Sequence, residues 1–113
     1  MIRVAICDDD ISFTGSIEEQ LHTLTSSLSI PLETETFFNG NSLLAELHRG
    51  IRFDIIFMDI QMPIMNGYEA TRIIRNSGRE DLNNIPILAM TANALAQDVQ
   101  AALKSGMNQH ISK

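Results

Sequence analysis

The chain has 113 residues, enough for one domain with a single hydrophobic core but too few for an added module. Its 8 basic and 14 acidic residues give a formal charge of -6, which argues against direct binding to nucleic acid. The sequence has no apolar run of about 18 residues and no leader after Met1, so we expect a cytoplasmic protein that does not insert into a membrane. The single Cys7 excludes a disulfide or zinc framework and is expected to be a buried packing residue.

Strand and helix patterns alternate through the first half of the chain. A β-branched run predicts a strand over residues 2–7 that stops at three consecutive acids, 8–10. Apolar spacings of four, four, three and four then predict a helix capped by Asp10 or Ser12. Its buried face would comprise Phe13, Ile17, Leu21, Leu24 and Leu28.

The next elements are an edge strand and a short helix. Residues 32–37 alternate polar and less polar side chains, which predicts a half-exposed strand. After the turn at 39–41, the leucines of 43–47 predict a helix that Gly50 ends.

The central stretch covers residues 53–67. Residues 55–59 form an almost continuous apolar run that stops on the carboxylate of Asp59, and a loop with Pro63 and Gly67 follows. A strand that is apolar on both faces belongs in the middle of a parallel sheet. Asp59 therefore lies at the carboxyl end of a central strand, where open α/β sheets bind their ligands.

The second half repeats the alternation. Asn66 and Glu69 form a capping pair for a helix that the polar stretch 78–84 closes, and residues 86–91 form a buried strand that ends on Thr91. A helix capped by Asn93 ends at Gly106, before a short strand over 109–112. The buried faces of the two helices would comprise Tyr68, Ile73 and Ile74, and Leu95, Val99, Ala102 and Leu103.

This alternation predicts an α/β fold: a flavodoxin-like, doubly wound parallel sheet of five strands in the order 2-1-3-4-5. Residues 1–113 form one domain that stops after strand five. The closing fifth helix that such a sheet needs is absent from this chain. Either the sequence is cut short there, or another segment covers that face of the sheet.

Chemistry-bearing side chains converge at the carboxyl edge of this sheet. Strands one and three are neighbours in the predicted order, which brings Asp8 and Asp9 beside Asp59. Three carboxylates this close repel one another unless a hard divalent cation lies among them. Oxygen ligands in an open cleft suit Mg²⁺, with Mn²⁺ as an acceptable substitute.

Two further groups reach this edge from strands four and five. Thr91 ends the strand next to that of Asp59. Lys113 ends the following strand, which is two strands away from that of Asp59, or about 9–10 Å at roughly 4.8 Å per strand. A metal cradle, a carboxylate nucleophile, a hydroxyl donor and a cation are the parts needed to move a phosphoryl group onto an aspartate.

Four motifs carry a resemblance to a known family. They are Ile6-Cys7-Asp8-Asp9-Asp10, Phe57-Met58-Asp59-Ile60-Gln61-Met62-Pro63 with Gly67, Ala89-Met90-Thr91-Ala92, and Ser112-Lys113. Together they resemble the receiver domain of two-component response regulators, over the whole chain except the closing helix. The joint spacing is specific, whereas no single motif would be.

The resemblance implies a role for each matching position. Asp59 is the phosphoacceptor, which takes a phosphoryl group from a phosphohistidine on a sensor histidine kinase or histidine phosphotransfer protein. Asp8 and Asp9 hold Mg²⁺, and the backbone carbonyl of Gln61 completes the metal site.

The resemblance also implies a switch. Thr91 carries the switch hydroxyl that is drawn toward the phosphoryl group, and Lys113 matches the invariant lysine of the family. His110 stands where the family usually has Tyr or Phe, which weakens the usual coupling between the hydroxyl and the aromatic ring. The surface that reports the change would be the helix over 93–106, the strand over 109–112 and the missing closing helix. A dimer would form through the face of that helix and strand.

We therefore expect a signalling switch that controls an output domain or partner protein, and not an enzyme that turns over an external substrate. A Mg²⁺-dependent phosphohydrolase of the haloacid dehalogenase type is the alternative, although such enzymes have a second Asp where this chain has Gln61. A degenerate receiver acting as a binding module is a third interpretation. The start at Met1 suits a stand-alone regulator, whereas residues 90–95 and 106–108 look more like the receivers of hybrid kinases.

Overall fold

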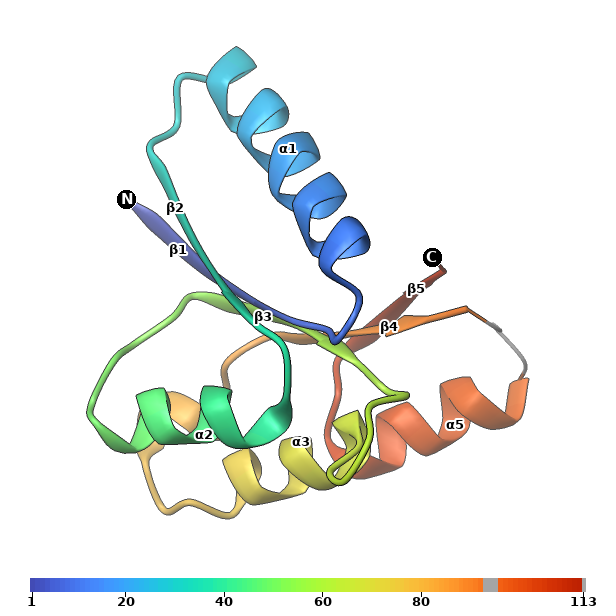
Figure 1. Ribbon diagram of the computed structural model, residues 1–113. Helices are drawn as coiled ribbons and strands as arrows, with labels where there is room; N and C mark the ends of the chain where they lie inside the picture. Colours follow the sequence, from blue (N-terminus) through green and yellow to red (C-terminus); the bar gives the residue numbers. More distant parts are fainter. Residues whose placement is uncertain (93–95, 113) are drawn as a thin grey trace.

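The computed structural model describes residues 1–92 and 96–112. Strands and helices alternate along the chain, with one additional short helix before the fourth strand (Figure 1). The elements are β1 (Ile2–Cys7), α1 (Ile11–Ser27), β2 (Leu32–Phe37), α2 (Gly40–His48), β3 (Ile55–Asp59), α3 (Gly67–Arg75), α4 (Glu80–Asn83), β4 (Ile87–Thr91), α5 (Ala96–Ser105) and β5 (Gln109–Ser112).

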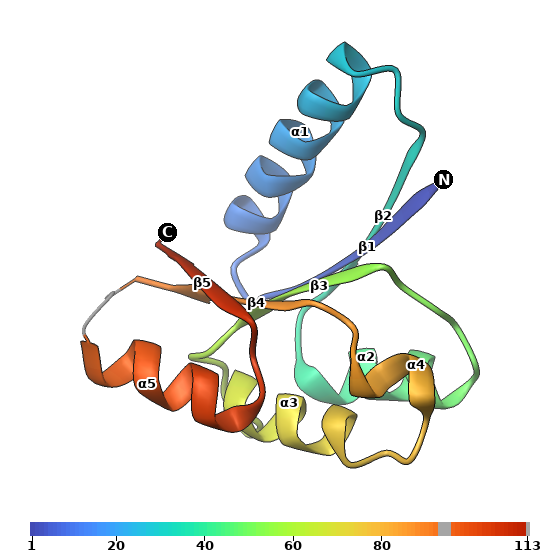
Figure 2. The same cartoon turned by 180° about the vertical axis from the view of Figure 1, so that it is seen from behind.

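The strands form one parallel sheet in the order β2-β1-β3-β4-β5, as predicted. In its register, Cys7 lies beside Met58 and Asp59 lies beside Met90, so β1, β3 and β4 end at the same edge. Helix α1 lies on one face of the sheet, and α2, α3 and α5 lie on the other (Figures 1 and 2). This two-sided arrangement is the doubly wound fold.

The buried side chains form two clusters, one on each face of the sheet. The larger lies under α2, α3 and α5 and includes Ile56 and Met58; the smaller faces α1 and includes Phe57. Successive side chains of a strand point to opposite faces, so β3 contributes to both clusters. The prediction of a central strand buried on both faces is confirmed.

Asparagine and aspartate side chains start three of the helices. Asp10, Asn39 and Asn66 cap α1, α2 and α3, and each accepts a hydrogen bond from the backbone N–H three residues later, at 3.1, 2.8 and 3.0 Å. Such a bond satisfies an N–H that has no partner within the helix. Asp10, rather than Ser12, is therefore the cap of α1.

Four leucine and isoleucine side chains predicted to be buried are exposed instead. On α1, Leu24 and Leu28 are exposed because the apolar cluster on that face extends along the helix only from Phe13 to Leu21. On α3 and α5, Ile73 and Leu103 are exposed. The small neighbours Ala70, Thr71 and Ala102 are buried in their place, because small side chains let these helices approach closely. Asn93 and Leu95 lie outside the described residues.

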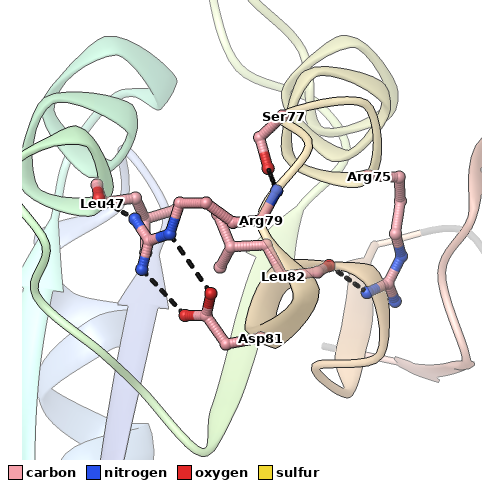
Figure 3. Close-up of polar contacts among 6 residues, drawn as sticks. All are labelled: Leu47, Arg75, Ser77, Arg79, Asp81 and Leu82. Atoms are coloured by element: carbon pink, nitrogen blue, oxygen red, sulfur yellow. Dashed lines mark hydrogen bonds and ion pairs between the residues drawn. The ribbon is translucent and has the colours of Figure 1, made fainter.

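The stretch 79–84, predicted as a polar segment that closes α3, contains the short helix α4. Its single large apolar residue, Leu82, is buried. Arg79 forms an ion pair with Asp81 and donates a hydrogen bond to the carbonyl of Leu47 at the end of α2 (Figure 3). No helix in the described part of the chain has the length and apolar character to cross a bilayer.

Candidate functional site

Three carboxylates meet at the carboxyl edge of the sheet. Asp8 directly follows β1, and Asp59 is the last residue of β3; both are buried, whereas Asp9 is exposed. One oxygen from each carboxylate lies within 4.8 Å of the others. The parallel β1–β3 pairing, in which both strands end together, produces this convergence.

Local backbone groups hold the two buried carboxylates. The N–H of Asp10 donates to Oδ1 of Asp8 at 2.9 Å, and the N–H of Gln61 donates to Oδ1 of Asp59 at 3.2 Å. In both cases the donor lies two residues after the acid, which fixes the carboxylate at the point where the strand turns into its loop. Each carboxylate keeps acceptor capacity beyond this bond, since a carboxylate has about four lone-pair sites.

This donor set fits a hard divalent cation. All three side chains offer oxygen, one of them from a solvent-exposed residue, and their mutual repulsion in a partly buried site is offset when a cation binds. Gln61, whose carbonyl was expected to contribute, is exposed and lies two residues beyond Asp59. The residues present therefore suit Mg²⁺ or Mn²⁺ rather than a metal that prefers sulfur or nitrogen.

The thiol of Cys7 is influenced by the negative charge of the site. Burial, followed by the negative charges of Asp8, Asp59 and Asp9, raises the pKa of this thiol to about 12. The S–H donates to the carbonyl of Asn39 at 3.4 Å. The thiol therefore stays protonated and packs as a small apolar group, as predicted.

Gly67 has a role that the sequence did not reveal. A Cβ atom built on it would lie 2.4 Å from the backbone oxygen of Asp59. Only glycine allows the start of α3 to pack this closely on the end of β3. The available signal was a glycine directly after the capping Asn66, at a helical position where glycine is otherwise unfavourable.

Two of the remaining predicted residues, Thr91 and His110, lie on neighbouring strands. Thr91 is buried at the end of β4, one residue beyond the partner of Asp59 in the sheet register. His110 is half-buried on β5 opposite Ala89, and borders a cavity of about 150 Å³ beside α5. Lys113 lies outside the described residues.

Comparison with known proteins agrees with this geometry. The family described as the response regulator receiver domain matches residues 4–113. The chain belongs to this family. Its sheet order and acidic edge are those that the resemblance led us to expect.

Curated relatives of this receiver domain are much longer proteins. Residues of the chain are 31% identical over 114 aligned positions to hybrid signal transduction histidine kinase L of Dictyostelium discoideum, covering 98% of the chain and 6% of the relative. The chain is also 40% identical over 62 positions to the sensor protein GacS of Pseudomonas syringae, and this alignment covers 54% of the chain and 7% of GacS. The domain thus spans a small part of each relative.

Solved structures share the fold over the whole chain. The chemotaxis protein CheY4 of Vibrio cholerae has a TM-score of 0.84 at 29% identity, with 100% of this chain and 87% of that chain covered. The receiver domain of a Pseudomonas aeruginosa sensor histidine kinase has a TM-score of 0.82 at 31% identity, with 99% and 84% covered. The latter structure has a magnesium ion coordinated in its active-site cleft.

Proposed function

We propose that this receiver domain is a phosphoacceptor switch in which Asp59 takes a phosphoryl group from a phosphohistidine. The observation that carries the proposal is the convergence of Asp59 with Asp8 and Asp9 at the end of two adjacent parallel strands. The donor would be a sensor histidine kinase or a histidine phosphotransfer protein, since the relatives are named as histidine kinases.

The transfer requires a nucleophile and compensation for negative charge. A carboxylate oxygen of Asp59 attacks phosphorus, a P–O bond forms, the P–N bond to the donor imidazole breaks, and the imidazole leaves with that electron pair and takes up a proton. Asp8, Asp9, Asp59 and the carbonyl of Gln61 would hold Mg²⁺, or Mn²⁺ in its place, which offsets charge on the phosphoryl oxygens. The magnesium ion in the similar Pseudomonas aeruginosa receiver supports this assignment.

Thr91 on β4, His110 on β5 and the undescribed Lys113 complete the proposed switch. The hydroxyl of Thr91 donates a hydrogen bond to a phosphoryl oxygen, and Lys113 supplies a cation from the end of the chain. Phosphorylation shifts an existing equilibrium toward the active conformation, and His110 follows in place of the usual aromatic residue. The face of α5 and β5 then acts on an output domain or partner protein, or on a second receiver.

Turnover of an external substrate has less support. The acid and base chemistry of aspartyl-phosphate hydrolases calls for a carboxylate two residues after the nucleophile, where this chain has the exposed amide of Gln61. A degenerate receiver is disfavoured because the three acids are present and brought together. We further infer that the domain works inside a longer hybrid kinase, because the relatives include hybrid kinases of which it spans 4–6%.

Intact-mass spectrometry with acetyl phosphate and Mg²⁺ tests the proposal. The wild-type mass is expected to rise by one phosphoryl group, and Asp59→Asn or a chelator is expected to abolish the rise. Asp54→Asn is the matched control, since Asp54 is an exposed acid just before the same strand and is expected to leave labelling unchanged. Equal labelling of Asp59→Asn, or labelling in chelator, would rule the mechanism out.

A further inference from the structure

An uncharged groove borders the acidic site on the side of α2. Two segments form its walls: residues 38–41, which run from the end of β2 into the first turn of α2, and residues 63–65, between β3 and α3. The groove measures about 440 Å³. Phe38 and Ile64 line it with 43% and 95% of their surfaces exposed, so two apolar side chains share one surface hollow instead of standing singly on the surface.

The exposed position of Ile64 is built into the backbone. Ile64 has a φ of 71°, and the N–H of Met65 donates to the carbonyl of Pro63 at 2.8 Å, which closes a γ-turn. A γ-turn with a positive φ is the rarer and more strained form, and a β-branched residue adopts it at a cost. Backbone strain of this kind clusters at functional sites.

Close packing on both sides holds this turn in place. A Cβ atom on Gly40 would lie 2.9 Å from the sulfur of Met65, so the loop fits tightly against the start of α2. Gly67 packs still more closely on the backbone of Asp59, with 2.4 Å from a Cβ atom to the Asp59 carbonyl oxygen. One loop therefore joins the groove to Asp59, and a partner seated in the groove is placed relative to Asp59.

A protein donor comes close to this groove. Asp59 is only 2% exposed, so a phosphohistidine reaches it from beyond the carboxyl ends of β3 and its neighbours β1 and β4, and the loop 63–65 that forms one wall of the groove follows β3. In the strand order β2-β1-β3, the end of β1, which Asp9 and Asp10 closely follow, lies between the ends of β2 and β3 from which the two walls of the groove continue. This edge of the sheet thus presents exposed acids next to an uncharged apolar hollow.

We propose that this groove is the docking site for the phosphohistidine-bearing protein. An apolar side chain on the helix that carries the phosphohistidine seats between Phe38 and Ile64, as an anchor in a preformed pocket. Basic residues of the same partner face Asp9 and Asp10, which supplies complementary charge. The proposal rests on the phosphoacceptor function and adds the surface by which the donor is recognised.

Rates of labelling from a protein donor and from a small donor separate docking from chemistry. The protein donors are GacS and hybrid kinase L without their matching receiver segments, autophosphorylated with ATP. The variants are Phe38→Ala and Ile64→Asn; asparagine tolerates a positive φ, so Ile64→Asn is expected to fold at least as well as wild type. Leu28→Asn, at the far end of α1, is the matched exposed control.

We expect each groove variant to slow transfer from the kinases by about tenfold or more, and to change labelling by acetyl phosphate by less than about twofold. Leu28→Asn is expected to change neither rate. Thermal melts that match wild type establish that the variants are folded.

Several results would overturn the proposal. Unchanged kinase transfer, or equal slowing with acetyl phosphate, would show that the groove does not dock the donor. Slowing by Ile11→Asn alone would place the donor across the start of α1, where Ile11 is 70% exposed. Absence of transfer to wild type from both kinases would mean that the groove does not recognise this class of donor. Failure of acetyl phosphate to label wild type would instead refute the phosphoacceptor function itself.

Discussion

At the scale of single residues, the acidic site influences groups that take no part in its chemistry. Cys7 lies directly before Asp8, and its pKa is raised to about 12 by burial and by the three nearby carboxylates. An unfolded cysteine has a pKa of about 9, so the folded thiol binds its proton more tightly than the unfolded one. This difference links folding stability to pH.

This link predicts that the fold loses stability at high pH because of Cys7. Below pH 9 both states are protonated and the contribution is constant; above it the unfolded state ionises first, so stability falls by at most about 1.4 kcal/mol per pH unit until about pH 12. Urea denaturation of wild type and Cys7→Ala from pH 8 to 11 measures this. The stability of wild type is expected to fall more steeply, and parallel curves would contradict the assignment.

At the scale of elements, Arg75 joins three segments on the face opposite α1. Its guanidinium donates to the carbonyls of Gly106 and Leu82, both at 3.0 Å, and to Oδ1 of Asn108 at 2.9 Å. The same Asn108 oxygen accepts the N–H of Ile87 at the start of β4. Figure 3 shows the bond to Leu82 that ties α3 to α4. Burial lowers the pKa of Arg75, but an arginine stays charged.

Replacement of Arg75 by methionine is expected to destabilise the domain by about 2 kcal/mol or more, since hydrogen bonds from a charged donor are lost while the carbonyls stay partly buried. Arg72→Met, on the exposed side of the same helix, is the control and is expected to change stability by less than about 0.5 kcal/mol. Denaturant melts of both variants check the difference. Equal effects would show that the Arg75 contacts add no stability.

The elements also show what a sequence can predict. The strands followed from apolar runs, from the alternation over 32–37 and from turn residues, because burial on one or two faces leaves a direct signal. The order of the sheet followed from the crossover rule and the edge-like character of the strand over 32–37. The convergence of Asp8, Asp9 and Asp59 followed from that order.

Features that depend on close packing could not be predicted in this way. Helix α4 and the burial of Leu82 depend on contacts with α2 and α3 that local periodicity does not contain. The exposure of Leu24 depends on where the apolar cluster ends, and the role of Gly67 depends on its approach to the backbone of Asp59.

At the scale of the whole molecule, the acidic edge couples metal binding to stability. A cation that binds the folded state alone stabilises the fold by mass action. Without the cation, the like charges of Asp8, Asp9 and Asp59 repel, and the exposed Asp9 can be removed without leaving a cavity.

Asp9→Ala is therefore expected to keep or raise the melting temperature in chelator and to lose most of the rise that millimolar Mg²⁺ gives wild type. Differential scanning calorimetry with and without Mg²⁺ measures both effects. Glu19→Ala, which removes an exposed acid from α1, is expected to keep the full Mg²⁺ response. A large loss of stability for Asp9→Ala in chelator would contradict the repulsion argument.

The chemical identity of the labelled residue tests the central claim most directly. After labelling with acetyl phosphate and Mg²⁺, reduction with borohydride converts a phosphorylated aspartate to homoserine, and peptide sequencing by mass spectrometry locates it. We expect homoserine at position 59 and loss of the phosphoryl group in hydroxylamine, because an acyl phosphate is reactive toward both reagents. A phosphoryl group that resists hydroxylamine, or homoserine at position 8 or 9 instead, would contradict the assignment of Asp59 as the phosphoacceptor.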